Sequence, residues 1–151
     1  MRAFADVREL AGAVGEHLGY SDWLTITQER VDTFADATGD HQWIHVDPER
    51  ARTGPFGGTI AHGYLTLSLI PGLMAQVYRV DGLAMGINYG TDKVRFPAPV
   101  PVGSTVRAGA ELVGARETGQ GWQAVIRVTV EARDIAKPVC VADTVVLLVP
   151  R

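Results

Sequence analysis

The residues best suited to chemistry in this chain lie between positions 39 and 63. Residues 39–45 read Gly-Asp-His-Gln-Trp-Ile-His, and His62-Gly63 opens a long apolar segment. Asp40 offers a carboxylate, His45 an imidazole that titrates near neutral pH, and Gly63 a backbone amide at a predicted helix start. A base, a proton donor and an anion-stabilising amide are the groups that add water to a double bond conjugated with a carbonyl.

Simpler interpretations of the same residues exist. An aspartate after a helix-ending glycine is often a solvated turn residue, and a lone histidine is often a structural core residue. His41, His45 and Asp47 are close in sequence but lack the cysteine partners and spacing of a zinc site. A hydrolytic triad with Ser68 lacks the Gly-x-Ser-x-Gly elbow, and no glycine-rich phosphate loop is present. We therefore expect no metal and no organic cofactor.

Several helices are predicted around these residues. Thr27 can cap a helix that ends at Gly39, so Asp40 comes directly after a helix end. Residues 60–78 are apolar on nearly every side, which predicts a central buried helix, and Pro71 and Gly72 are expected to kink it or end its regular part. Two shorter helices are predicted at residues 6–14 and 48–52.

After Gly82 the apolar period changes from about 3.6 to 2, the period of strands. Residues 105–112 and 126–131 alternate, residues 140–149 are almost continuously apolar as in a central strand, and residues 87–96 change face, which predicts a bulge near residues 90–93. Short links favour antiparallel pairing. We expect an α+β fold in which an antiparallel sheet wraps around the 60–78 helix, and a homodimer that covers the exposed sheet edge and helix.

Composition narrows the class of protein. The 151 residues fit one domain, 1–151, and 46% hydrophobic with 21% charged residues is ordinary for a globular protein. A net charge of −3 gives no broad basic field, so nucleic acid is not the expected partner. No signal segment and no bilayer-spanning apolar run is visible, so we expect a cytoplasmic protein without a membrane partner. The single Cys140 is expected to be a buried apolar residue.

The pattern also resembles a known family. Gly39-Asp40-x-x-x-Ile44-His45, with Ala51 further on, is similar to the signature of R-specific enoyl-CoA hydratases in the MaoC-like dehydratase group. Residues 56–63 and 88–100 resemble other segments of that family. The resemblance implies a hot-dog fold, usually dimeric, that acts on acyl thioesters of coenzyme A. It also implies Asp40 and His45 as the catalytic pair and the backbone N–H of Gly63 as the oxyanion donor.

The chain departs from the family at Gln42-Trp43, where Asn-Pro is common. Trp43 lacks the fixed φ of proline, so the loop and the pocket are expected to differ from the family's. Gln42, Trp43, His62 and Tyr64 are our candidates for substrate binding, with His62 more typical of a structural hydrogen-bonding residue. Trp43, Tyr64, Met74 and Met85 are candidates for lining an acyl tunnel, with plain core as the alternative. Lys93 and Arg95 are candidates for binding coenzyme A phosphates, with surface solvation as the alternative.

The sequence thus predicts an R-specific 2-enoyl-CoA hydratase that also runs in reverse as a 3-hydroxyacyl-CoA dehydratase, a hydro-lyase. Two alternatives stay open. One is a hot-dog thioesterase, in which water attacks the thioester carbonyl. The other is a non-catalytic acyl-thioester-binding subunit of a dehydratase.

Overall fold

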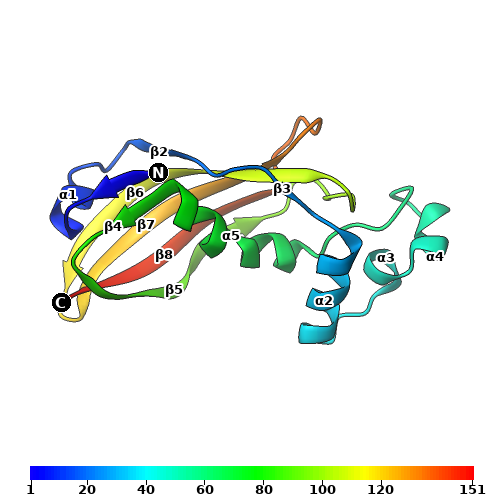
Figure 1. Ribbon diagram of the computed structural model, residues 1–151, viewed down its shortest axis with the longest axis horizontal. Coiled ribbons are helices and arrows are strands. Elements are labelled where there is room, and N and C mark those ends of the chain that lie inside the picture. Colours follow the sequence, from blue (N-terminus) through cyan, green and yellow to red (C-terminus); the bar gives the residue numbers. More distant parts are fainter.

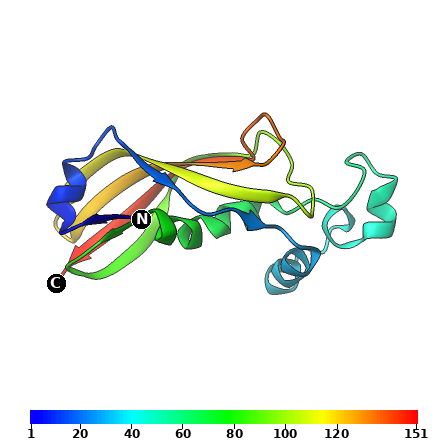
Figure 2. The same cartoon turned by 45° about the horizontal axis from the view of Figure 1, so that its top comes forward.

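The computed structural model describes residues 1–151. Its main feature is an antiparallel six-stranded sheet with the order β2-β6-β7-β8-β5, in which β3 also pairs with β6. The strands are β2 (His17–Tyr20), β3 (Leu24–Thr25), β5 (Leu83–Arg95), β6 (Thr105–Thr118), β7 (Gly121–Ala132) and β8 (Cys140–Pro150). Helix α5 (Gly63–Val77) runs along one face of this sheet (Figure 2). The predicted α+β layer arrangement is confirmed.

Alternation along the strands directs one face of the sheet toward α5. Val106, Ala108 and Ala110 of β6 are fully buried, and so are Val128 and Val130 of β7. β8 lies between β7 and β5, as predicted for a central strand. Its first residue, Cys140, is buried, and burial raises the pKa of the thiol to about 11, so this cysteine is an inert core residue.

Helix α5 is shorter than predicted at its start. Ile60 forms a β-bridge with Pro101, and Ala61 donates to the carbonyl of Val100, so the backbone becomes helical only at Gly63. The helix continues through Pro71, so Pro71 does not end it. Pro71 lies on the exposed side, where solvent can bind the carbonyl that loses its helical donor.

β5 is an edge strand with almost all of its side chains exposed. Its register shifts between Asn88 and Gly90 and again between Thr91 and Lys93, which confirms the bulge predicted there. A third shift lies between Leu83 and Met85.

The N-terminal segment covers one end of the sheet. β1 (Arg2–Phe4) pairs in parallel with β4 (Tyr78–Val80), and α1 (Val7–Ala11) follows. The Asp6 side chain caps α1 by accepting from the amides of Arg8 and Glu9. α1 ends at Ala11, earlier than the predicted Val14, because the amide of Ala13 turns to the carbonyl of Leu10 in a tighter final turn.

Three helices gather at the other end of the molecule, away from both chain ends (Figure 1). They are α2 (Gln28–Thr38), α3 (Trp43–Val46) and α4 (Pro48–Arg52). Thr27 caps α2 through a bond from the amide of Arg30, and Gly39 ends it at a left-handed φ of 81°, as predicted. None of the helices has both the length and the apolar character needed to span a bilayer.

Candidate active site

Asp40 enters the site from the end of α2. The left-handed Gly39 turns the chain sharply, and Asp40 follows with an exposed side chain. Its amide donates to Thr38 Oγ1 at 3.4 Å, and its Oδ1 accepts from the amide of Gln42 at 3.3 Å. Both bonds are long, and only the bond from Gln42 involves the carboxylate, so the carboxylate is weakly oriented and keeps lone pairs available.

His45 lies on α3 and is 7% exposed. Its Nδ1 is 2.7 Å from the carbonyl oxygen of Ile60, and because a carbonyl only accepts, the ring nitrogen donates. Nε2 of the neutral ring is therefore the nitrogen that is free to accept a proton. Burial lowers the pKa of His45, although the bond to Ile60 and the charge of Asp40 act in the opposite direction. His45 is thus held as a neutral base.

His62 lies against both residues. It is 2% exposed, and its Nε2 donates to the backbone carbonyl of Asp40 at 3.0 Å. Its ring stacks on His45 with centroids 3.9 Å apart and planes 25° apart. The opposite nitrogen, Nδ1, is buried without a hydrogen-bond partner.

These three side chains form a close cluster. One ligand atom from each of Asp40, His45 and His62 lies within 4.8 Å of the others. One water molecule, about 2.8 Å from each of two acceptor atoms, can bridge two atoms of the cluster that are this far apart. The cluster can therefore hold one water molecule between its members.

Gly63 follows His62 as the first residue of α5. Its amide has no intrahelical acceptor, and the helix dipole adds to its attraction for negative charge. The Phe96 ring lies so close that a Cβ at position 63 would be 2.9 Å from Phe96 Cδ2. Only glycine leaves the backbone accessible at this position. The arrangement joins a proton-accepting pair to an anion-stabilising amide.

Comparison with known proteins identifies the family of this chain. A family model described as "MaoC like domain" matches residues 9–135. The chain belongs to the MaoC-like family. The 3-hydroxyacyl-thioester dehydratase Z of Mycobacterium tuberculosis (strain ATCC 25618 / H37Rv) is 62% identical over 147 residues, 97% of each chain. Nodulation protein N of Rhizobium leguminosarum bv. viciae is 42% identical, over 93% of this chain and 89% of that protein.

A solved structure extends the comparison to the fold. The (R)-hydratase from A. caviae, described as involved in PHA biosynthesis, has a TM-score of 0.74 and 28% identity, over 89% of this chain and 96% of that one. The predicted hot-dog fold is confirmed. This MaoC-like protein is a hydro-lyase, as its sequence predicted.

The residues at the family's Asn-Pro position lie beside the cluster in sequence. Gln42 precedes α3 and offers its backbone amide to Asp40. Trp43, the first residue of α3, packs under the guanidinium of Arg50 of α4, 4.4 Å from the ring centroid. Gly54 leaves room for this indole, since a Cβ there would be 3.0 Å from it. Tyr64, next to Gly63, is 70% exposed. Their contact with substrate stays a prediction.

Within one chain, Lys93 and Arg95 do not join the cluster. Pairing places Lys93 opposite Asp143, next to the buried Ala142, so Lys93 projects from the face of the sheet that is turned away from α5. Two hydrogen bonds from Arg127 at 2.8 and 3.0 Å hold the pKa of Asp143 below its usual value. Binding of coenzyme A phosphates by Lys93 and Arg95 stays a prediction.

Gln28 is a member of the site that sequence reasoning missed. Its Nε2 donates to the backbone carbonyl of His45 at 2.7 Å, and its Oε1 accepts from the hydroxyl of Thr59 at 2.6 Å. It thereby joins α2, α3 and the segment that leads to α5. No local pattern marks this glutamine, because its partners are 17 and 31 residues away along the chain.

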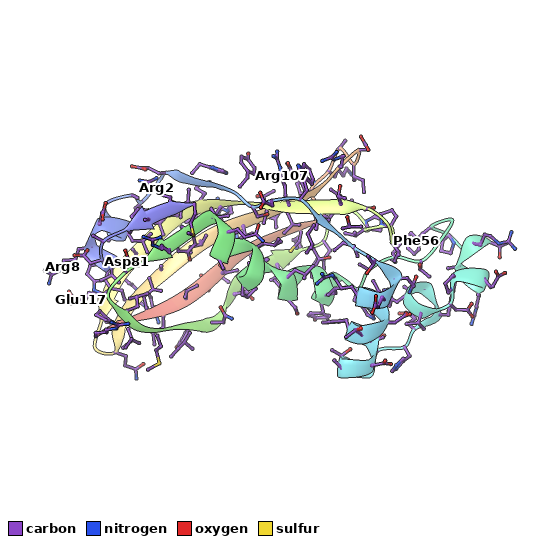
Figure 3. All side chains as sticks on the ribbon, viewed as in Figure 1. Arg2, Arg8, Phe56, Asp81, Arg107 and Glu117 are labelled. Atoms are coloured by element: carbon purple, nitrogen blue, oxygen red, sulfur yellow. The ribbon has the colours of Figure 1, made fainter.

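A cavity of about 450 Å³ lies between α5 and strands β5 and β8, and it begins at Leu67 and Ser68, one turn after Gly63. Of the candidates for lining an acyl tunnel, Met74 lines this cavity, whereas Trp43, Tyr64 and Met85 do not. Asp40 and His45 are not among its lining residues, so the reacting groups lie outside it. The loop between α4 and α5, which carries Phe56, lies on the side of α2–α4 (Figure 3). An apolar ligand in this cavity would lie along α5.

Proposed function

We propose that this protein is an R-specific 2-enoyl-CoA hydratase, which also runs in reverse as a 3-hydroxyacyl-CoA dehydratase. The observation that supports it most strongly is the free Nε2 of neutral His45 in one cluster with the Asp40 carboxylate, beside the unpaired amide of Gly63. These are the groups that hydration of a trans-2-enoyl thioester needs.

The reaction follows from these positions. The Asp40–His45 pair orients one water and takes a proton from it while the water oxygen bonds to C3 of the enoyl group. The C2–C3 π electrons move toward the thioester carbonyl, whose oxygen becomes negative and accepts a hydrogen bond from Gly63 N–H. The pair then returns a proton to C2, and the negative charge on oxygen is lost. We assign base and acid to the pair jointly, because groups this close share their titration.

The oxyanion contact supplies much of the expected rate. Removing one such donor typically costs about 3–4 kcal/mol of transition-state stabilisation. The Gly63 donor is a backbone group at a helix start, so it needs no reorganisation as charge develops. The configuration at C3 is set by the face of the double bond that the water attacks, and the proposal is that this face gives the R product.

The relatives support both directions of the reaction. The mycobacterial relative carries the name of a 3-hydroxyacyl-thioester dehydratase, and the A. caviae structure that of an (R)-hydratase. Dehydration is the reverse of hydration, so both reactions use the same catalytic groups. The cavity along α5 has a volume and an apolar lining suited to an acyl chain.

We also propose that the working form is a homodimer joined through the β5 edges. β5 is unpaired on its outer side and exposes Met85, Ile87 and Tyr89. An exposed apolar edge strand promotes association with another strand. Antiparallel pairing of two β5 strands would continue the sheet and bring two α5 helices together over it.

The direct test is to incubate the purified protein with crotonyl-CoA and follow loss of enoyl absorbance, then determine the configuration of the 3-hydroxybutyryl product. We expect water addition with R configuration. Release of free thiol without loss of the enoyl group would instead identify a thioesterase. Binding of crotonyl-CoA without turnover would identify a non-catalytic subunit. An S product would contradict the stereochemical part of the proposal.

A further inference from the structure

We propose that His62 is a positioning residue, which fixes the Asp40 backbone and the His45 ring relative to the Gly63 amide. This inference deepens the proposed function and rests on it. It concerns how the three reacting groups are held together, since they come from separate segments of the chain.

The first support is the anchor on Asp40. The bond from His62 Nε2 to the Asp40 carbonyl, at 3.0 Å, is shorter than the 3.3 and 3.4 Å bonds that Asp40 makes within its own loop. It is also the contact that joins the Asp40 loop to the start of α5. Because Asp40 is exposed and follows a glycine, its backbone has little else to hold it.

The second support is the stack on His45. The His62 ring lies 3.9 Å from the His45 ring on one side and 4.9 Å from the Phe34 ring on the other. The rotation of His45 is therefore restricted by His62 on its face and by Ile60 at Nδ1. Two stacked imidazolium ions would repel each other, so the His62 ring disfavours the protonated form of His45.

The third support is the second ring nitrogen of His62, Nδ1. A buried histidine that serves only packing normally has both ring nitrogens satisfied. His62 Nδ1 is buried and has no hydrogen-bond partner among the groups of the protein. The ring orientation is thus set by its contacts with Asp40 and His45 rather than by its own best hydrogen bonding.

Few charged groups surround His45, so a substitution at His62 should produce a measurable change in the pKa of His45. Asp40 approaches from the loop after α2, and His62 from the start of α5. From α2, Gln28 donates to the His45 backbone, and its Nε2 also donates to the carboxylate of Asp32 at 2.9 Å. The positive form of His62 lowers the pKa of His45. Removing the His62 imidazole should therefore shift the titration of His45 upward.

The test uses two substitutions that separate the contacts. His62→Gln retains an N–H donor for the Asp40 carbonyl, and His62→Phe retains a ring against His45 but loses the donor. His17→Gln and His17→Phe at an exposed histidine of β2 are the matched controls. We expect His62→Phe to lower kcat for crotonyl-CoA hydration by about 10- to 100-fold with little change in KM, and His62→Gln to restore most of it. Both substitutions at His62 should shift the acidic limb of the pH–rate profile for hydration to higher pH.

A folded His62→Phe variant with full kcat would overturn the proposal, and so would equal losses in both variants that follow only the fraction of folded protein. Should His62→Phe not fold, NMR titration of His45 in His62→Gln decides: an upward shift supports the proposal and an unchanged titration overturns it. This NMR experiment needs no turnover. A wild-type protein inactive on enoyl-CoA would therefore reject the proposed function while the coupling of His62 to His45 is still measured.

Discussion

His45 donates from Nδ1 to the carbonyl oxygen of Ile60 at 2.7 Å, and the amide of Ile60 donates in return to the carbonyl of Ile44 at 3.0 Å. These two bonds attach α3 to the segment that precedes α5. The bond from Nδ1 also fixes the tautomer of His45, so that Nε2 accepts a proton. The same local pairing thus determines both the position of the imidazole and its chemical role.

The pH dependence follows from the burial of His45. Its pKa is lowered from the ordinary value of 6.5, so the neutral, proton-accepting form persists into mildly acidic solution. We expect kcat/KM for hydration to fall only as pH drops through a value below 6.5. In an NMR titration, His41 should titrate above 6.5 because of its hydrogen bond to Asp36, and His45 below it. An acidic limb and a His45 titration both above 6.5 would contradict this assignment.

Gly63 is predicted to be intolerant of a side chain for two separable reasons. A Cβ would collide with the Phe96 ring, and it would also obstruct approach of the thioester to the backbone. We expect Gly63→Ala to lower kcat/KM by about 100-fold, since small misplacements at a reacting centre have effects of this size. The double variant Gly63→Ala/Phe96→Ala should recover thermal stability but not activity.

Gly58→Ala is the control for these variants, because a Cβ at Gly58 meets open space. Full activity in the Gly63→Ala/Phe96→Ala variant would show that only the collision with Phe96 matters. The amide of Gly63 would then not require close approach of the substrate.

Gln28 should matter for stability and activity together. Gln28→Leu leaves the hydroxyl of the buried Thr59 and the carbonyl of His45 without their present partners. We expect a loss of about 2 kcal/mol in the free energy of unfolding, which corresponds to a fall in Tm of about 4–8 °C. Thermal unfolding and crotonyl-CoA kinetics measure the two effects. Gln120→Leu in an exposed turn should change neither.

The β5 edge should carry the dimer contact. Charges at Ile87 and Tyr89 would be buried without partners in a β5–β5 interface. We expect Ile87→Lys/Tyr89→Lys to be monomeric in sedimentation-velocity experiments in which the wild type is dimeric. Val113→Lys, at an exposed apolar residue of the inner strand β6, should remain dimeric. An undisturbed dimer in the double variant would place the interface elsewhere.

Features that depend on neighbours in sequence were predictable. The cap at Thr27, the stop at Gly39 and the bulge of β5 near residues 90–93 each follow from a few adjacent residues. The sheet was predictable because alternating strands with short links pair with their neighbours. Asp40, His45 and Gly63 could be selected because the family pattern places them at recognisable spacing.

The remaining features depend on contacts between distant segments. Ile60 was predicted to be helical from its apolar neighbours, but its bridge to Pro101 extends the backbone there. The short helix α3 carries no strong propensity and was missed. The stacking of His62 on His45 and the bonds of Gln28 arise only when α2, α3 and α5 meet. Neither leaves a periodic signal in the sequence.

The most direct test of the account is crotonyl-CoA hydration by Asp40→Asn and His45→Gln, with circular dichroism to establish that both variants are folded. Each substitution keeps the side chain polar while removing its ability to exchange a proton in the reaction. We expect loss of enoyl absorbance to be nearly abolished in each folded variant, and the two together to be little worse than either alone, because the residues act as a unit. Activity close to wild type in both folded variants would contradict the assignment of Asp40 and His45 as the catalytic pair.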